Sequence, residues 1–130
     1  MYIKEFDTWN SIKKEVNEKE KPHKVRVREL RWGSLGVNIG SEIDGKGATF
    51  TRPLIILSLA GPDLALVVPC STKLHDRPGY IKIQLKNKEV SACIHQIKII
   101  STKRIYDRIQ KISQEQINNL KNQIKDFYRL

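Results

Sequence analysis

The sequence has few of the residues that bind metals, and it has no run that could cross a membrane. Among its 130 residues are only two cysteines and three histidines, and the spacing of Cys70 and Cys93 matches no zinc motif. We therefore expect no metal and no cofactor, and two buried free thiols. No apolar run approaches the ~20 residues of a membrane span, and residues 1–20 lack the apolar stretch of a secretion signal. These absences predict a cytoplasmic protein with no membrane partner.

Acidic residues are the other scarce class. Fourteen acidic against 24 basic residues give a formal net charge of +10 and a pI of about 9.8. The excess of basic over acidic groups is 2 in residues 1–30, 3 in residues 31–97 and 5 in residues 98–130. The charge therefore covers the folded part and favours a polyanionic partner, because Lys and Arg displace condensed counterions from phosphates. An acidic protein would satisfy the same field.

An amphipathic helix is predicted near each end of the chain. Residues 6–20 place their apolar side chains on one helical face, with Pro22 just beyond the end; these side chains are Phe6, Trp9, Ile12 and Val16. This helix either packs on its own domain or forms a cover or a dimer contact. In the C-terminal helix, Ser113 and Gln116 have the spacing of a capping box, and Ile112 and Ile117 that of a hydrophobic staple. The apolar stripe continues through Leu120, Ile124 and Phe127.

Short strands and turns fill the space between these helices. Residues 25–32 and 80–85 alternate apolar and polar positions, residues 53–59 and 64–69 are continuous apolar runs, and residues 90–100 give one or two further strands. A long glycine-bearing loop covers residues 36–51, and ordered loops of that length are more often functional than idle. We predict a mainly β, α+β fold: a small antiparallel barrel over residues 25–130 with a helical extension, residues 1–24.

Three positions next to the predicted buried strands can carry chemistry. Arg52 stands at the mouth of one strand, where a guanidinium can bind two phosphate oxygens or form a salt bridge with Glu42 or Asp44. Ser71 follows the next strand, and its hydroxyl can donate to a phosphoryl oxygen or cap the turn. His95, expected in an alternating strand, is either an acid–base group or an ordinary surface histidine.

Four segments in this order resemble the PemK/MazF family of toxins from type II toxin–antitoxin systems. They are G-x-x-x-G-S-E-x-D-G (36–45), R-P-L-I-I-L (52–57), V-P-C-S-T (68–72) and H-Q-I-K-I-I-S-T-K-R-I (95–105). The resemblance covers residues 28–112. It implies an SH3-like barrel that forms a homodimer and acts as a sequence-selective, metal-independent endoribonuclease on single-stranded RNA. It also implies an acidic antitoxin as partner.

The same resemblance assigns site residues. In such proteins the arginine of the R-P pair and the hydroxyl residue after the buried strand surround the scissile phosphate, which here means Arg52 and Ser71, with His95 as the third catalytic candidate. The residues expected to bind substrate are Ser41, Glu42, Thr72, Lys73 and Gln96. This chain departs from its relatives at His95, where a carboxylate is frequent, at Ile43, where glutamine is frequent, and in the order of Ser71 and Thr72. The acid–base role therefore stays open between His95 and Glu42.

The chemistry expected is attack of the RNA 2′-hydroxyl on the adjacent phosphorus, with Arg52 stabilising the charge that develops. The products would be a 2′,3′-cyclic phosphate and a 5′-hydroxyl, and unpaired RNA would be the substrate because its base edges are accessible. Two alternatives stay open. One is an SH3-like module that binds RNA without cutting it, and the other is a toxin of the gyrase-poison type that acts on a protein.

Overall fold

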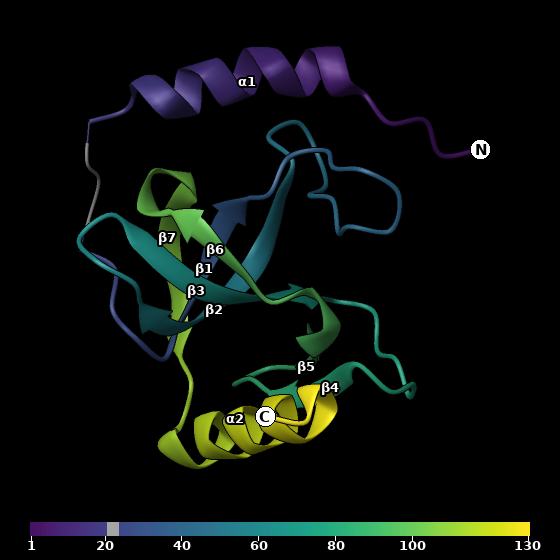
Figure 1. Cartoon of the computed structure of the whole chain (residues 1–130), viewed down its shortest axis with the longest axis vertical. Coiled ribbons are helices and arrows are strands. Elements are labelled where there is room, and N and C mark those ends of the chain that lie inside the picture. Colours follow the sequence, from purple (N-terminus) through teal and green to yellow (C-terminus); the bar gives the residue numbers. More distant parts are fainter. Residues whose placement is uncertain (21–23) are drawn as a thin grey trace.

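The computed structural model describes residues 1–20 and 24–130, and two helices flank its β-sheet (Figure 1). The elements are α1 (Phe6–Glu18), β1 (Glu29–Ser34), β2 (Thr51–Leu59), β3 (Leu64–Ser71), β4 (Tyr80–Gln84), β5 (Glu89–Cys93), the 3₁₀ turn η1 (Ile94–Gln96), β6 (Lys98–Ser101), the 3₁₀ turn η2 (Thr102–Arg104), β7 (Ile105–Lys111) and α2 (Gln114–Tyr128). Both predicted helices are confirmed. Pro22 lies outside the described residues.

The seven strands form one antiparallel sheet in the order β4-β5-β3-β2-β1-β7, with β6 also pairing to β3. Strand β3 joins the two parts of the sheet, because its first half pairs with β6 and its last two residues pair with β5. No pairing among the described strands joins β4 to β7. The predicted fold of a small antiparallel sheet with two helices is confirmed, although the sheet is open and "barrel" describes it only loosely.

The hydrophobic core lies on both faces of the sheet. Helix α2 covers one side with Ile117, Leu120 and Ile124, which pack with buried residues of β1, β2 and β3. Helix α1 lies on the opposite side (Figure 1), where Trp9 packs edge-on against Phe50 of the long loop, with 5.8 Å between ring centroids. Most of each predicted apolar stripe therefore faces the core, and α1 packs on its own chain. Phe6 and Phe127, at the outer end of each stripe, are exposed instead.

Helix α2 begins at the predicted cap, but the capping box is only half formed. The Ser113 hydroxyl accepts a hydrogen bond from the Gln116 N–H at 3.3 Å, and Ile112 and Ile117 are both buried beside it. The Gln116 side chain turns away and bonds both backbone groups of Gln84, at 2.8 and 3.0 Å. Because β4 is an edge strand, this amide satisfies backbone groups that would otherwise be left unpaired.

Two local predictions are wrong. Strand β1 begins at Glu29 rather than at residue 25, because Arg28 has a φ of 72°, and this left-handed conformation interrupts an extended strand. Beyond it, buried Glu29 pairs with Arg31 at 3.1 Å.

His95 lies in the turn η1 and not in a strand, so strand alternation does not decide which way its ring points. Strand β7 was not predicted, since most of its side chains are exposed.

Candidate active site

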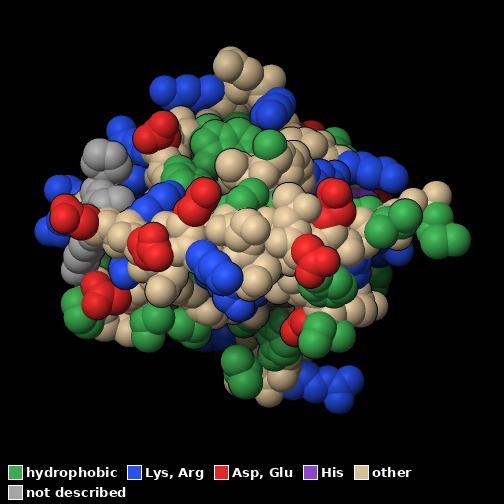
Figure 2. All heavy atoms as spheres, turned by 90° about the horizontal axis from the view of Figure 1, so that it is seen from above, with side chains coloured by type: hydrophobic (Ala, Val, Ile, Leu, Met, Phe, Trp, Pro, Cys, Tyr) green, Lys and Arg blue, Asp and Glu red, His purple; other side chains and the backbone are tan. Residues whose placement is uncertain are grey.

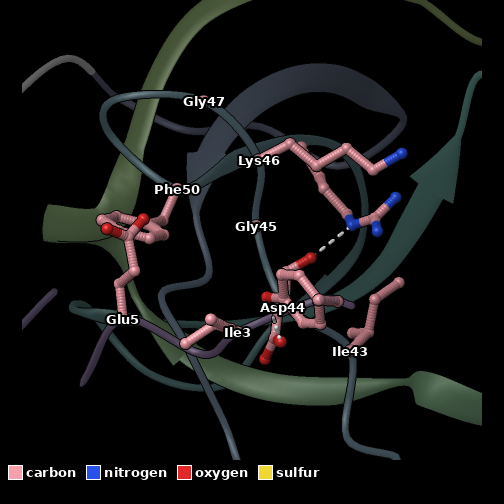
Figure 3. A pocket seen from close by; sticks show the side chains of 10 residues that line it. Ile3, Glu5, Ile43, Asp44, Gly45, Lys46, Gly47 and Phe50 are labelled. Carbon is pink, nitrogen blue, oxygen red and sulfur yellow. Dashed lines mark hydrogen bonds between the residues drawn. The ribbon is translucent and has the colours of Figure 1, made fainter.

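Arg52 lies at the start of β2, half-buried, with its guanidinium held by one hydrogen bond. Its Nε–H donates to the backbone carbonyl of Asp44 (dashed in Figure 3). Within the described chain the two terminal nitrogens have no hydrogen-bond partner and no carboxylate lies within ion-pairing distance. The predicted alternative of a salt bridge to Glu42 or Asp44 is therefore not observed. Four N–H donors stay available to a phosphate.

The Asp44 carboxylate is engaged elsewhere. It accepts hydrogen bonds from the Tyr2 hydroxyl at 2.7 Å and the Asn38 N–H at 2.6 Å, and it pairs with the Lys4 ammonium at 3.3 Å. Burial alone would raise the pKa of Asp44, but these hydrogen bonds outweigh it and hold the pKa below its usual 3.8. The bond to Asp44 in turn raises the pKa of Tyr2. Asp44 is therefore an ionised anchor for the N-terminal segment.

Ser71 ends β3 beside Arg52. Leu54 pairs with Pro69 between β2 and β3, and continuing this register by two residues sets Arg52 opposite Ser71. Ser71 is buried, with 7% of its surface exposed. Its hydroxyl oxygen accepts a hydrogen bond from the Lys73 N–H at 3.2 Å, which leaves the hydroxyl proton available for donation. Both residues line a cavity of about 180 Å³; its other lining residues are Ser41, Ile43, His75, Tyr80, Cys93, His95 and Gln96.

Two histidines flank one tyrosine in this cavity. The His75 ring stacks on Tyr80 with 4.2 Å between centroids, and the His95 ring lies 4.8 Å from the same tyrosine at 60°. His95 Nδ1 is 2.9 Å from the Gly79 carbonyl, which can only accept, so Nδ1 carries the proton and Nε2 is the free nitrogen. Desolvation, then the charges of Arg77 and Lys73, lowers the pKa of His75.

The long loop forms the facing wall and is fixed by Gln96. The Gln96 side-chain carbonyl accepts from the Ile43 N–H at 3.1 Å, and its amide donates to the Ser41 carbonyl at 2.9 Å. The Glu42 carboxylate instead accepts from the Ile39 N–H at 2.9 Å within the loop. Ser41, Arg52, Ser71, His95 and Gln96 thus meet at one cavity, whereas Glu42, Thr72 and Lys73 lie outside its lining.

Cys93 lines the same cavity, but it is protonated at neutral pH. Burial raises the pKa of the Cys93 thiol to about 11, although the nearby Arg52 charge acts in the opposite direction. Burial raises the pKa of Cys70 as well. The prediction of two buried free thiols is confirmed, and neither thiol is a nucleophile at pH 7 because the thiolate is the reactive form.

A second, larger cavity of about 490 Å³ also borders Arg52, and Figure 3 shows the side chains that line it. One wall comes from the N-terminal segment, with Tyr2, Ile3 and Glu5, and the opposite wall from Asp44–Gly47 and Phe50 of the long loop. Arg52 is a lining residue of both cavities. Arg52 and Ile43 therefore border both cavities.

The sequence analysis did not identify His75 and Tyr80 as site residues. They belong to the polar loop after β3 and the start of β4, and only the folded loop stacks one ring on the other. A local signal did exist, since H-D-R-P-G-Y places a histidine and a tyrosine around a Pro-Gly turn directly after the predicted phosphate-binding serine. Without the fold, that signal gives no direction for either ring.

The outer face of α1 is not a uniformly basic surface. Seen from the α1 side, acidic and basic side chains are interspersed (Figure 2), in line with the small basic excess of residues 1–30. The described part of the chain contains no helix long and apolar enough to cross a membrane.

Comparisons with known proteins identify both a family and a fold. The model of the PemK-like, MazF-like toxins of type II toxin–antitoxin systems matches residues 26–128. MazF (Form-I) from Deinococcus radiodurans is structurally similar, with a TM-score of 0.69 at 11% identity over 84% of this chain and 100% of that chain.

Two mycobacterial structures are also similar. An endoribonuclease in complex with its cognate antitoxin, from Mycobacterial species, has a TM-score of 0.60 at 10% identity over 82% of this chain and 97% of that chain. The Mycobacterium tuberculosis toxin MazF-mt6 has a TM-score of 0.60 at 14% identity over 79% and 98%. No curated protein sequence matched this chain.

Proposed function

Because the chain belongs to the PemK-like, MazF-like family of toxins from type II toxin–antitoxin systems, we propose that it is an endoribonuclease that cuts single-stranded RNA. The observation that carries this proposal is the free end of Arg52. Among residues 1–20 and 24–130 its terminal nitrogens have no hydrogen-bond acceptor, and Ser71 and two histidines share its cavity. A cation, a hydroxyl donor and two proton-transfer groups are what cleavage of a phosphodiester by its own 2′-hydroxyl requires.

In the proposed reaction the 2′-oxygen attacks phosphorus and the bond from phosphorus to the 5′-oxygen breaks. Arg52 stabilises the negative charge on the phosphoryl oxygens, and Ser71 donates to one of them. His75, whose lowered pKa keeps it neutral near pH 7, takes the proton of the 2′-hydroxyl. His95, which must enter this step protonated on both ring nitrogens, gives the Nε2 proton to the leaving 5′-oxygen, while its Nδ1–H bond to Gly79 holds the ring in place. The step uses only these side chains, so the proposed activity is independent of metal and cofactor.

The remaining predicted residues have supporting roles in this proposal. Ser41 and Gln96 shape the wall that faces the cut phosphate, because Gln96 fixes the Ser41 and Ile43 backbone. Thr72 and Lys73 are exposed just beyond Ser71, where they would contact the neighbouring backbone of the RNA. Glu42 stabilises its loop through the Ile39 N–H, so we assign the proton transfers to the histidines and give Glu42 only an indirect part in RNA binding.

The proposal includes two protein partners. One structural neighbour is an endoribonuclease in complex with its cognate antitoxin, and a net charge of +10 suits an acidic antitoxin. We further propose that the protein forms a homodimer. We also propose a cytoplasmic location, since the RNA substrate and the antitoxin would both be found in the cytoplasm. Light scattering coupled to size-exclusion chromatography would measure the dimer directly.

The test is to incubate the pure protein with a long unpaired RNA in EDTA and to map the ends of the products. We expect a 2′,3′-cyclic phosphate on one fragment and a 5′-hydroxyl on the other, and no cleavage of DNA of the same sequence. A 3′-hydroxyl with a 5′-phosphate would contradict the 2′-hydroxyl mechanism. An RNA that stays intact although it binds would identify a binding module, and a block of gyrase supercoiling would identify a poison of that enzyme.

A further inference from the structure

We propose that the N-terminal segment, residues 1–5, forms one wall of a nucleotide subsite that holds the base next to the cut phosphate. The proposal rests on the proposed function, because it takes the phosphate to lie on Arg52. It adds a binding site built from a part of the chain that precedes the family match, which begins at residue 26.

The position of the larger cavity supports this inference. Arg52 lines both the cavity of about 180 Å³ that contains the two histidines and the cavity of about 490 Å³ beside the N-terminal segment. An RNA strand whose phosphate lies on the Arg52 terminal nitrogens must continue in both directions from that point. The larger cavity is one of those directions, and its lining includes Ile3 and Lys46 (Figure 3).

Hydrogen bonds and an ion pair fix the N-terminal segment against the long loop. The Lys4 ammonium donates to the backbone carbonyls of Asn38 and Gly40 and pairs with the Asp44 carboxylate. The Tyr2 hydroxyl donates to the same carboxylate at 2.7 Å. Asp44 also holds Arg52 through its backbone carbonyl. One residue therefore positions both the guanidinium and the wall beside it, which is the preorganisation that a binding site requires.

The side chains of the cavity suit a nucleotide. Tyr2 is 68% exposed and Ile3 is 74% exposed, so their apolar surfaces remain available for a base to stack on. Lys46 supplies a cation on the opposite wall for the next phosphate (Figure 3). Glu5 supplies an acceptor that repels phosphate and suits an exocyclic amino group. We therefore expect this subsite to prefer adenine, guanine or cytosine over uracil.

Three variants test the subsite: Tyr2→Ala, Tyr2→Phe and the control Phe6→Ala. Tyr2→Ala removes the ring, whereas Tyr2→Phe keeps the ring and removes only the hydrogen bond to Asp44. Phe6 is another exposed aromatic residue, in the adjoining helix, with 48% of its surface accessible, and it lines neither cavity. Each variant is given a random-sequence RNA pool, the product ends are sequenced, and kcat and KM are measured on one cleaved sequence.

We expect Tyr2→Ala to raise KM about 10-fold and to flatten the base preference at one position adjacent to the cut. Phe6→Ala should keep both the KM and the preference of the wild type, whereas Tyr2→Phe should lose less than Tyr2→Ala because it keeps the ring and gives up only the hydrogen bond to Asp44. If Tyr2→Phe loses as much as Tyr2→Ala, Tyr2 acts only through Asp44 and the subsite is excluded. Unchanged KM and base preference in Tyr2→Ala would exclude it equally.

Binding separates this proposal from the proposed function. The same variants are titrated with RNA that carries 2′-O-methyl groups and cannot be cut, and affinity is read by fluorescence anisotropy. Weaker binding by Tyr2→Ala than by both Tyr2→Phe and Phe6→Ala supports the subsite even if the wild-type protein does not cleave RNA. If the wild type cuts RNA but all variants bind alike, only the subsite fails. If the wild type neither binds nor cuts RNA, both proposals fail.

Discussion

Arg52 donates its Nε–H to the backbone carbonyl of Asp44, while the Asp44 carboxylate binds other groups. The guanidinium is thereby oriented without being neutralised, because a carbonyl accepts a hydrogen bond but carries no net charge. A carboxylate in the same place would compete with phosphate for the terminal nitrogens. Of the two interpretations of Arg52 that the sequence left open, the salt bridge is not formed among the described residues, and the phosphate-binding role is the one that we propose.

The Asp44 anchor should fail in acid. Its pKa in the folded protein lies below the usual 3.8, so the carboxylate stabilises the fold above about pH 4, and this contribution is lost as the pH falls through the folded-state pKa. We expect Asp44→Asn to lower the free energy of unfolding at pH 6, as measured by urea denaturation. The difference from wild type should shrink at pH 3. An equal difference at both pH values would show that charge at Asp44 has no part in the anchor.

The pH dependence of cleavage should separate the two histidines. A general base must be neutral, and the lowered pKa of His75 places the acid limb of the kcat/KM profile below pH 6.5. We expect His75→Ala to remove that limb. His95→Asn keeps an N–H donor for Gly79 and loses the second ring nitrogen, so it should lower kcat while the acid limb and the stability stay as in the wild type.

An acid limb that persists in His75→Ala would reassign the base. Full activity in His95→Asn would make His95 a positioning residue that acts through Gly79.

The cysteines should be inert. Cys93 is 2% exposed, and burial raises its pKa to about 11. Ellman's reagent at pH 7 should therefore titrate neither thiol in the native protein and both thiols in guanidinium. RNA cleavage should survive the native incubation. Loss of activity in step with one modified thiol would show that the cavity around Cys93 opens in solution.

Trp9 should couple α1 to the long loop. Its ring is 6% exposed, packs on Phe50 and fills the space beside Gly36, where an added Cβ would overlap it. Trp9→Ala should lower the free energy of unfolding by about 3 kcal/mol. Phe127→Ala, whose side chain is 41% exposed on α2, should cost under ~1 kcal/mol. Equal costs would mean that α1 contributes little to the fold.

The elements predicted best from the sequence carry strong local signals. Strands β2 and β3 are continuous apolar runs, and α2 begins at Ser113 with its staple in place. Strand β1 was placed too early because its start depends on the left-handed backbone of Arg28, which no composition pattern indicates. Gln116 was assigned to a capping box because its competing partner, Gln84, lies 32 residues away in the sequence.

The candidate site was predictable only in part for a similar reason. Arg52 and Ser71 follow from their places at the ends of buried strands, and adjacent strands bring them together. His75 was missed because its direction is set by stacking on Tyr80 across a loop. The hydrogen bonds from Gln96 to residues 41 and 43 join positions more than 50 residues apart in the sequence, so the positioning role of Gln96 appears only in the folded chain.

The most direct test of the account is RNA cleavage by Arg52→Ala, measured in EDTA beside Arg52→Lys and the control Arg108→Ala. Arg108 lies on β7, and its side chain is 57% exposed. We predict that Arg52→Ala lowers kcat by about 100-fold or more with an unchanged circular dichroism spectrum. Arg52→Lys should restore only part of the rate, because an ammonium cannot bind two oxygens in the same fork. Wild-type cleavage by a folded Arg52→Ala protein would contradict the account.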